Sequence, residues 1–532
     1  MASSLSKELH FLLIPLMSQS HIIPLTDFAK LLAFHGVNVS IITTPLNAQK
    51  YKSIVTHAMK SNLKIQLIPL HFPSQEVGLP QGCENMDTLN SLELFKDFFL
   101  ASEMMQEPLE KLIQELEPKP SCIISTSPLT WTQQVATKFK IPRYIFQTVS
   151  CFTLYCFHIL NQTKLQDTLV LDSDSFLIPN VPHKIEFTKA QLPFDSSKQS
   201  SQGHMKSILD KIRKTQDLAR GTLINTCGEL ENWYVDSYKK AVKKVFCVGP
   251  VSLCNKEMDE MVDRGNKASI DEHSNCLNWL DSMKPKSVIY ACFGTLSNIS
   301  FLQMKEIGLG LESSNVPFIW IIRGLNLTLE VEKWLRDENF EEKVKGRGMI
   351  IRGWAPQILI LSHSAVGGFL THCGWNSTLE GISCGVPMIT FPMFAEQFYN
   401  EKFIVNVLKI GVRVGVEVST ISWNEEKNGV LVNKDQIKKA IDELMDKDLE
   451  GEDRRERAKE LAHISKKAIE EEGSSYLNIK LLIEDVMHAL NDKDGEANNV
   501  ATINKSKHSN TDAMTLKVKD PPLIRITMTE DE

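Results

Sequence analysis

The chain lacks the features that mark membrane proteins, disulfide-rich secreted proteins and zinc proteins. Its 11 cysteines include no Cys-x-x-Cys pair, so we expect neither a zinc site nor a disulfide framework, but free thiols in a reducing compartment. No apolar run approaches the roughly 20 residues that a membrane-spanning helix needs. The N-terminal segment MASSLSKELHFLLIPL has no basic leader and no small-residue cleavage site, so its apolar run is interpreted as a first strand. A soluble, cytoplasmic protein is predicted.

An excess of basic residues is missing as well. The 59 Lys and Arg against 66 Asp and Glu give a net charge of −7, and basic residues are not interleaved with aromatic ones. Nucleic acid and anionic membranes are therefore not expected as partners. A hydrophobic content of 42% and a charged content of 23% are typical of a globular protein, and 532 residues predict two or three domains.

Three catalytic signatures are absent or occur without context. The segment LMSQSH (16–21), after the first predicted strand, has no glycine, which disfavours a nicotinamide-dependent enzyme. The hydrolase pattern G-x-S-x-G does not occur. An Asp-x-Asp pattern, which holds Mn²⁺ or Mg²⁺ in metal-dependent glycosyltransferases, occurs at 172–174, 446–448 and 492–494. Because all three lie in polar stretches and none closes a strand, we predict no metal site.

What the sequence does contain is a regular alternation of short apolar runs and helix-like segments. Pro24 lies early in an amphipathic segment that stops at Gly36, as helices tend to begin and end. Strands separated by helical patterns indicate a parallel, doubly wound sheet. The strands predicted in the first half are 10–16, 37–43, 64–70, 122–125, 143–147, 222–225 and 245–250.

A second alternation follows a charged stretch at 253–275, which has no apolar period and is interpreted as a surface linker. Its predicted strands are 287–293, 317–322, 348–352, 365–371 and 387–391. Two such halves imply an α/β protein of two Rossmann-like domains facing across a cleft. We predict an N-terminal domain over 1–250, a linker over 251–286, a C-terminal domain over 287–460, helices over 461–490 and a disordered tail over 491–532, in which 523–528 could still pair as a strand.

The stretch FLTHCGWNSTLEGISCGVP (369–387) places polar side chains between a predicted strand and a helix. Ligands of open α/β sheets bind at this position, and the helix N-terminus suits phosphate. Asn376 and Ser377 can cap the helix or donate to a diphosphate, and His372 adds a ring donor. Glu380, on the same helix face as Asn376, offers the carboxylate that two vicinal ribose hydroxyls require. From these residues alone, an ordinary helix cap and a nucleotide site both remain open.

The longer segment from Trp354 to Gln397, WAPQILILSHSAVGGFLTHCGWNSTLEGISCGVPMITFPMFAEQ, closely resembles the signature box of the plant family-1 UDP-dependent glycosyltransferases. Further matches resemble the branch that acts on triterpenoids, steroids and flavonoids: GPVSLCN (249–255), RGNKASIDE (264–272), FGTLS (293–297) and EQFYNEK (396–402). The resemblance covers about 7–490 and implies a GT-B fold. UDP-sugar would be held mainly by the C-terminal domain.

The resemblance also implies roles for individual residues in donor binding. Trp354 would stack on the uracil, with Ala355 and Gln357 near the base and ribose, and Glu380 would take the ribose hydroxyls. The diphosphate would be held by His372, Asn376, Ser377 and Thr295, and the sugar would be contacted by Trp375, Glu396 and Gln397. Gln397 is typical of members that use glucose, so UDP-glucose is the expected donor, with no further cofactor.

For the chemistry, the resemblance implies that His21 in SQSHIIP is the base that takes the acceptor proton. On residue statistics a structural role would be the default for one of 14 histidines, but the pKa of histidine suits the task. Ser20 could touch a phosphate, and Thr148 fits a family position that contacts the sugar. UDP departure would be aided by the helix N-terminus and His372 without a metal.

One position departs from the family pattern. In CIISTSPLTW (122–131), Thr126 stands where family members usually have the aspartate that orients the histidine and supports its positive charge. Threonine accepts a hydrogen bond but cannot offset a charge. Three explanations stay open: Ser125, Ser127 or a water orients His21; the acceptor is acidic enough to need little base; or activity is low.

We therefore predict an inverting, metal-independent transfer of glucose from UDP-glucose to a hydroxyl of a hydrophobic plant secondary metabolite, either a triterpenoid or sapogenin, or a flavonoid. Apolar segments at 95–99 and 146–152 are candidates for contact with this small aglycone. A monomer is expected. The alternative, prompted by Thr126, is a UDP-sugar-binding protein with weak or no catalysis.

Overall fold

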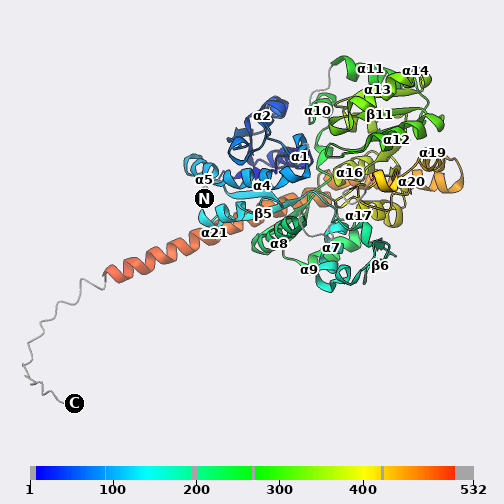
Figure 1. Cartoon of the computed structure of the whole chain (residues 1–532). Coiled ribbons are helices and arrows are strands. Elements are labelled where there is room, and N and C mark those ends of the chain that lie inside the picture. The colour runs from blue at the N-terminus through cyan, green and yellow to red at the C-terminus, as the bar shows by residue number, and fades with distance from the viewer. Residues whose placement is uncertain (1–7, 90, 194–201, 266–269, 421–424, 510–532) are drawn as a thin grey trace, which may run out of the picture. The chain divides into compact units, whose positions relative to one another are not determined.

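The computed structural model describes residues 8–509 except 90, 194–201, 266–269 and 421–424. The chain separates into one compact unit over Met1–Leu482 and a second unit over Ile483–Glu532. The first unit holds two parallel sheets, each flanked by helices (Figure 1). The prediction of two doubly wound halves is thereby confirmed.

The first sheet has seven strands in the order β3-β2-β1-β4-β5-β8-β9, and all of its pairings are parallel. Each of the strands predicted in the first half is present. Strand order reverses between β1 and β4, which makes the carboxyl ends of these two strands the place for a ligand. The strands are β1 (His10–Ile14), β2 (Asn38–Thr43), β3 (Ile65–Pro69), β4 (Cys122–Thr126), β5 (Arg143–Gln147), β8 (Gly221–Ile224) and β9 (Val245–Cys247).

Helices connect these strands, as the parallel pairing requires. A short antiparallel hairpin of β6 (Ser175–Leu177) and β7 (Glu186–Thr188), which the sequence did not predict, lies outside the sheet. The helices are α1 (Gln19–Phe34), α2 (Pro45–Lys50), α3 (Lys52–Lys60), α4 (Phe95–Met104), α5 (Gln106–Glu115), α6 (Thr132–Lys138), α7 (Cys151–Thr163), α8 (Gln202–Leu218) and α9 (Asn232–Ala241).

The second sheet has six parallel strands in the order β12-β11-β10-β13-β14-β15. All five predicted strands are present, and the short β15 was missed. Its order reverses between β10 and β13, and both sheets have the dinucleotide-binding arrangement around that point. The strands are β10 (Val288–Cys292), β11 (Phe318–Ile322), β12 (Gly348–Arg352), β13 (Val366–Thr371), β14 (Met388–Thr390) and β15 (Gly411–Arg413).

The cores of both halves consist of strands that are covered on both faces. Every residue of β1, β4, β10, β11 and β13 is buried, which explains why these strands read as continuous apolar runs. The helices of the second half are α12 (Phe301–Ser313), α13 (Leu329–Asp337), α14 (Phe340–Lys343), α15 (Gln357–Leu361), α16 (Trp375–Ser383), α17 (Gln397–Lys402), α18 (Glu425–Asn428), α19 (Lys434–Met445) and α20 (Leu449–Ile469).

The charged connection between the halves is not the surface linker that we predicted over 253–275. It contains helices α10 (Met258–Asp263) and α11 (Ile270–Asp281). Helix α10 contacts both α3 and α15, from opposite halves of the unit. Cys254 and Asn255 are buried, and the Arg264 side chain is only 11% exposed. Apolar periodicity could not reveal this burial, because it rests on charge pairing.

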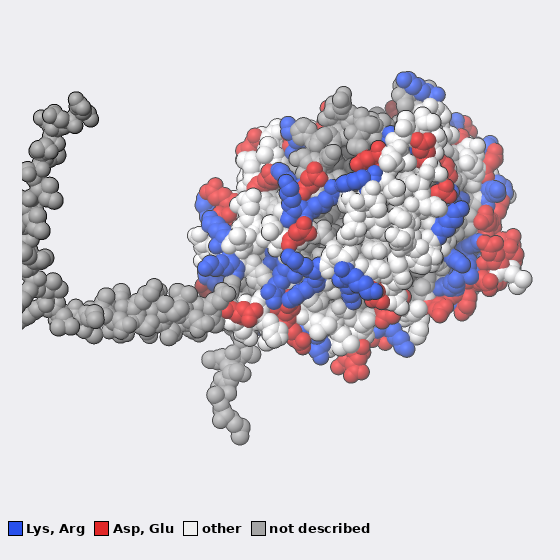
Figure 2. All heavy atoms as spheres, turned by 90° about the horizontal axis from the view of Figure 1, so that it is seen from below, with Lys and Arg blue, Asp and Glu red and all other residues white. Residues whose placement is uncertain are grey.

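At the C-terminus, α21 (Ser474–Ser509) continues past residue 491, where a disordered tail was predicted. The sequence NDKDGEANNVATINKSKHS has no proline that would end the helix. Residues 510–532, with the possible strand at 523–528, lie outside the described part. Among the described helices, none combines the length and the apolar character that a membrane crossing requires. On the face drawn in Figure 2, basic side chains lie among acidic ones.

Candidate functional site

The predicted catalytic and donor-binding residues lie at the carboxyl ends of strands near the two points where strand order reverses. Ser20 and His21 are in the first turn of α1, directly after β1, and Thr126 ends β4. On the other sheet, Thr295 follows β10, and His372 follows β13. Each half therefore contributes its own reversal point to one site.

Hydrogen bonds between described residues join the two halves at this site. The Thr295 hydroxyl donates to the side-chain carbonyl of Gln19 at 3.0 Å, and the Asn376 amide donates to the backbone carbonyl of Ser20 at 2.8 Å. The Trp375 indole N–H donates to the Asn225 carbonyl at 2.8 Å. The predicted donor-binding residues thus lie against the helix that carries the predicted base.

A proline makes one of these bonds available. In an α-helix the carbonyl of Ser20 would accept from the backbone N–H four residues later, but that residue is Pro24, which has no N–H. The carbonyl is left for the Asn376 amide from the other half. Pro24 was predicted only as a helix-start signal, and its effect on the carbonyl depends on a partner that is distant in sequence.

His21 is neutral at physiological pH and has a free ring nitrogen. Burial lowers its pKa to about 4. Its Nδ1 is buried and has no hydrogen-bond partner in the described residues. A neutral imidazole can accept a proton. However, no hydrogen bond among the described residues holds the His21 ring in place through Nδ1.

The hydroxyls of Thr126, which stands where the family has aspartate, and of its neighbour Ser125 form hydrogen bonds with groups other than His21. Thr126 is fully buried, and its Oγ1 accepts the backbone N–H of Leu16 at 2.8 Å. The Ser125 hydroxyl contacts Thr132 Oγ1 and accepts from Arg143 Nε, each at 2.9 Å. No hydrogen bond from either residue to His21 is present in the described chain. Of the explanations for the substitution, orientation of His21 by Ser125 is therefore not supported.

Asp87 is a buried carboxylate near the start of α1 that the sequence did not single out. It accepts from the Ser18 hydroxyl and from the Gln19 backbone N–H, both at 2.8 Å. Burial raises its pKa. A carboxylate at a helix N-terminus interacts favourably with the helix dipole and so stabilises the helix. No local motif could reveal this role, because Asp87 is 68 residues away from Gln19 in sequence.

On the donor side, His372 is tightly packed and neutral. Burial, together with the charge of Arg323, lowers its pKa to about 3. A Cβ atom on Gly294 or Gly374 would lie 2.6 or 2.4 Å from His372 Nε2, so only glycine leaves room for this ring. A neutral ring can still donate one N–H to a phosphate oxygen.

Some of the buried polar atoms that have no partner among the described residues belong to the predicted site residues, although others lie elsewhere in the chain. Within the described part of the chain they include His372 Nδ1, Trp354 Nε1 and Asn376 Oδ1, in addition to His21 Nδ1. Such atoms are rare in folded proteins and call for an explanation. A polar ligand in this site would supply their partners.

The side chains predicted to contact the sugar differ in their availability. The Gln397 carbonyl accepts the backbone N–H groups of Met393 and Phe394, at 2.8 and 3.2 Å, which leaves its amide N–H₂ available. Burial raises the pKa of Glu396. Trp375 is 1% exposed and its indole N–H is bonded to Asn225, so its side chain joins the two halves, and its contact with the sugar stays a prediction.

The predicted ribose and base anchors are both in contact with arginines that the sequence did not assign. Glu380 accepts from Arg264 at 2.6 Å and from the Gln357 amide at 2.7 Å, and that amide also donates to Ser377 at 3.0 Å. The Arg323 guanidinium lies 4.9 Å from the centre of the Trp354 ring, a cation–π contact. Arg264 is the first residue of the matched segment RGNKASIDE, which is the one sequence signal that could have found it.

The remaining predicted residues are placed without distinctive contacts. Ala355 is buried, directly after Trp354, and Thr148 is half-buried after β5. The Asp-x-Asp pattern at 172–174 belongs to a turn, since Asp174 accepts the backbone N–H groups of Val170 and Leu171. No cluster of potential metal ligands occurs among the described residues.

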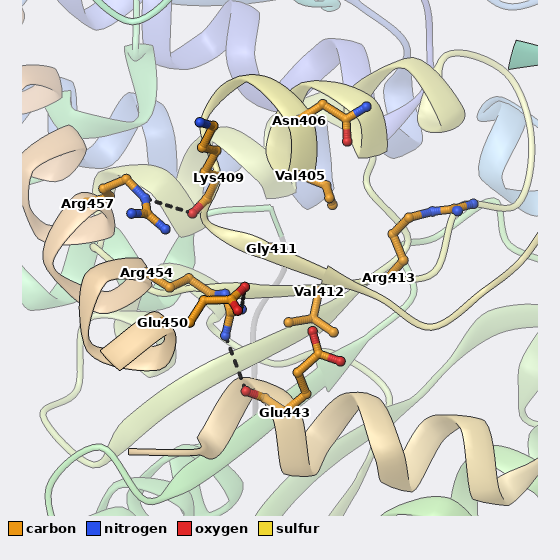
Figure 3. Close-up of a pocket in the computed structure, with 10 residues that line it drawn as sticks. All are labelled: Val405, Asn406, Lys409, Gly411, Val412, Arg413, Glu443, Glu450, Arg454 and Arg457. Atoms are coloured by element: carbon orange, nitrogen blue, oxygen red, sulfur yellow. Dashed lines mark hydrogen bonds and ion pairs between the residues drawn. The ribbon is translucent and has the colours of Figure 1, made fainter. Parts of the chain in front are cut away.

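A cavity of about 530 Å³ lies elsewhere, between β15, α19 and α20 (Figure 3). Its polar lining includes Arg454, which donates to Glu450 and to the Glu443 carbonyl, and Arg457, which donates to the Lys409 carbonyl. It shares no lining residue with the predicted site. We therefore do not identify this cavity with the donor site.

Two family models match the chain, and together they cover both halves. The model described as "Glycosyltransferase, N-terminal domain" matches residues 7–253, and that described as "UDP-glucoronosyl and UDP-glucosyl transferase" matches residues 255–447. The second match contains the segment from Trp354 to Gln397.

Curated relatives and solved structures agree with these models. UDP-glycosyltransferase 73C3 of Arabidopsis thaliana is 48% identical over 90% of this chain and 96% of its own length. UDP-glycosyltransferase 1 of Barbarea vulgaris is 46% identical over 91% and 97%. The structure of Glycyrrhiza uralensis UGT73P12 with glycyrrhetinic acid 3-O-monoglucuronide matches with a TM-score of 0.85 at 35% identity, covering 94% of this chain and all of that one. Medicago truncatula UGT71G1 with UDP-glucose matches with a TM-score of 0.72 at 25% identity, covering 91% and 100%.

Proposed function

The chain belongs to the UDP-glucoronosyl and UDP-glucosyl transferase family, and on that basis we propose that it transfers glucose from UDP-glucose, with inversion, to a hydroxyl of a hydrophobic plant metabolite. It is a UDP-glycosyltransferase with a GT-B fold, and its donor is a UDP-sugar. Glucose as the sugar is supported by Gln397, whose amide N–H₂ remains available. We place the enzyme in the cytoplasm, acting as a monomer.

For the acceptor we propose a triterpenoid or sapogenin, with a flavonoid as the second class. The triterpenoid is supported by UGT73P12, which was solved with glycyrrhetinic acid 3-O-monoglucuronide. The aromatic segments at 95–99 and 146–152 lie in α4 and around the start of α7, within the half that carries His21. Phe98, Phe146 and Phe152 are fully buried in the core, so the half-buried Phe95 and Phe99 are the aromatic residues that we propose for contact with a flat aglycone.

In the proposed mechanism, His21 takes the proton of the acceptor hydroxyl as its oxygen attacks the anomeric carbon of the sugar. The bond to UDP breaks on the opposite face, and its electron pair leaves with the diphosphate. The N-terminus of α16, His372, Asn376, Ser377 and Thr295 are proposed to stabilise that negative charge. The observation that carries this assignment is the bond between Asn376 and the Ser20 carbonyl, since it brings the donor helix against the residue before His21.

The second candidate, a UDP-sugar-binding protein with weak or no catalysis, is favoured by one observation only. Thr126 gives its hydroxyl oxygen to Leu16 and supplies no charge to His21. Against it, the chain matches UDP-glycosyltransferases over 90% of its length. We therefore favour the active transferase.

Replacing His21 tests the proposed base. We expect His21→Ala to abolish transfer and to leave UDP affinity within about twofold, because the ring acts on the acceptor and not on the nucleotide. His35→Ala is the matched control: His35 caps the other end of α1, and its ring donates to the Leu31 carbonyl and packs on Tyr476, away from the site. Product formation followed by mass spectrometry, with UDP binding by calorimetry, separates the roles. Turnover by His21→Ala would remove His21 as the base.

A further inference from the structure

Arg264, in the connection between the halves, contacts a residue predicted to bind the nucleotide. Its Nη1 donates to Glu380 Oε1 at 2.6 Å, and on its other side it bonds to Asp27 Oδ2 at 2.8 Å. The three side chains are almost fully buried, with exposed fractions of 11%, 6% and 4% for Arg264, Glu380 and Asp27. Burial lowers the pKa of Arg264, but the two carboxylates more than offset this and raise it overall. The guanidinium is therefore permanently charged.

The hydrogen bonds at Glu380 leave two lone-pair directions of its carboxylate unused. An ionised carboxylate offers about four lone-pair directions, two on each oxygen. Arg264 uses one on Oε1, and the Gln357 amide uses one on Oε2. One direction remains on each oxygen, and two vicinal hydroxyls, such as those of a ribose, can each donate to one of them.

Arg264 is itself held in place from the N-terminal half. Asp27 lies on α1 and also accepts from the Asn255 amide at 2.9 Å, while the Asn255 carbonyl accepts from Lys30 at 2.8 Å. This network fixes the guanidinium between α1 and α16. The position of Glu380 is therefore tied to the helix that carries His21.

The next residue of the connection contacts the other nucleotide anchor. Gly265 has a φ of +93°, and a Cβ atom there would lie 2.6 Å from a ring carbon of Trp354 and 2.7 Å from the Ile23 methyl group. Only glycine fits this position. Two consecutive residues of the connection thus touch the predicted ribose anchor and the predicted base anchor.

We propose that Arg264 is a positioning residue for nucleotide recognition, which holds the Glu380 carboxylate so that it binds the ribose hydroxyls of the donor. It acts through Glu380 and does not itself touch the substrate. The inference rests on the proposed role of Glu380, and it adds the connection between the halves to the donor site.

The test compares UDP with 2′-deoxy-UDP, binding each to the full-length protein by calorimetry. Wild type is expected to prefer UDP by about tenfold or more, the effect of one hydrogen bond to a charged acceptor. In Arg264→Met we expect UDP to bind about tenfold more weakly and 2′-deoxy-UDP to change little, so that the preference falls to about threefold or less. Arg264→Lys, which keeps one charged donor, should restore part of it.

Arg454→Met is the matched control, because Arg454 is also buried and ion-paired but lines the separate cavity of Figure 3. It should keep the full preference for UDP. Asp27→Asn provides a second variant that leaves Arg264 in place, and a reduced preference is expected there too, so the test does not depend on Arg264→Met folding.

Equal weakening of both nucleotides in Arg264→Met, with the preference intact, would overturn the inference and reduce Arg264 to a structural role. Should Arg264→Met not fold, an undiminished preference in Asp27→Asn would overturn it. A wild type that does not distinguish the two nucleotides would instead remove Glu380 as the ribose acceptor, and with it the basis for the inference. Transfer activity could survive that last result, so the two failures are distinguishable.

Discussion

At the scale of single residues, the enzyme combines the side chains that we propose for donor binding with a threonine where the family has the carboxylate that supports the base, which we propose to be His21. Comparison of the sequence with the family pattern identified Thr126 as a departure. The structure adds that its hydroxyl oxygen accepts the backbone N–H of Leu16. His21 is left with a pKa of about 4 and a free Nδ1. If His21 is the base, the imidazolium formed during transfer would have no carboxylate bonded to its Nδ1 among the described residues.

Thr126→Asp tests this account through the pH dependence of the rate. A base works in its deprotonated form, so the wild-type rate should fall only as the pH drops through about 4, the pKa of His21. A carboxylate at 126 would stabilise the charged ring, raise this pKa and move the acidic limb to higher pH. We also expect the kcat of Thr126→Asp to exceed that of wild type at pH 7, where His21 is deprotonated in both proteins.

Thr126→Asn serves as the control for that measurement. Its amide oxygen can still accept the Leu16 N–H but carries no charge. The acidic limb should stay at its wild-type position, and kcat should not rise. An unmoved limb in Thr126→Asp would show that a carboxylate at this position does not reach His21.

Residues whose role depends on a distant partner escaped prediction. Asp87 caps α1 from a position 68 residues away, and Arg264 joins Asp27 to Glu380 across 237 and 116 residues. No spacing or period in one sequence encodes such pairs. The signature residues were predictable because they lie together in one segment around α16.

At the scale of elements, apolar runs predicted the strands of both sheets, most clearly the central strands, such as β1 and β13, that are buried on both faces. The same criterion failed for the connection at 253–275, where burial rests on charged groups such as Arg264. It also missed β15, in which only the middle of the three residues is fully buried. Helix α1 shows a further limit of prediction from sequence. Pro24 was recognised as a helix-start signal, but the Ser20 carbonyl that it leaves without a helical donor was not.

Pro24→Ala tests the role of that carbonyl. The new backbone N–H can bond to Ser20 and compete with the Asn376 amide. The helix itself should gain stability, since proline disfavours a helix interior. We expect the KM for UDP-glucose to rise by about fivefold, corresponding to roughly 1 kcal/mol for one hydrogen bond, while the melting temperature stays level or rises.

Pro108→Ala is the control for a proline-to-alanine change in a helix, because Pro108 lies in the first turn of α5 and makes no part of the site. It should leave the KM for UDP-glucose unchanged. If Pro24→Ala also leaves that KM unchanged, the bond between Asn376 and Ser20 does not contribute to donor binding.

At the scale of the whole molecule, two similar sheets with the same strand order provide two reversal points, and the site forms where these meet. Each half alone would carry only part of the proposed site. One half has His21, and the other has α16, the proposed donor-binding helix. The bonds of Gln19, Ser20 and Asn225 to the second half hold the set together. Alternation alone predicted two Rossmann-like domains facing across a cleft, whereas the contacts that join the halves, such as that of Thr295 with Gln19, were not predictable.

The most direct test of the whole account is a mass-spectrometric transfer assay with UDP-glucose and a panel of triterpenoid and flavonoid aglycones, in which wild type and Thr126→Asp are run side by side. We predict a product one glucose heavier from wild type with a triterpenoid acceptor, and more of it from Thr126→Asp. Absence of product from both proteins, under conditions in which UDP binds, would contradict the proposed glucosyl transfer by His21.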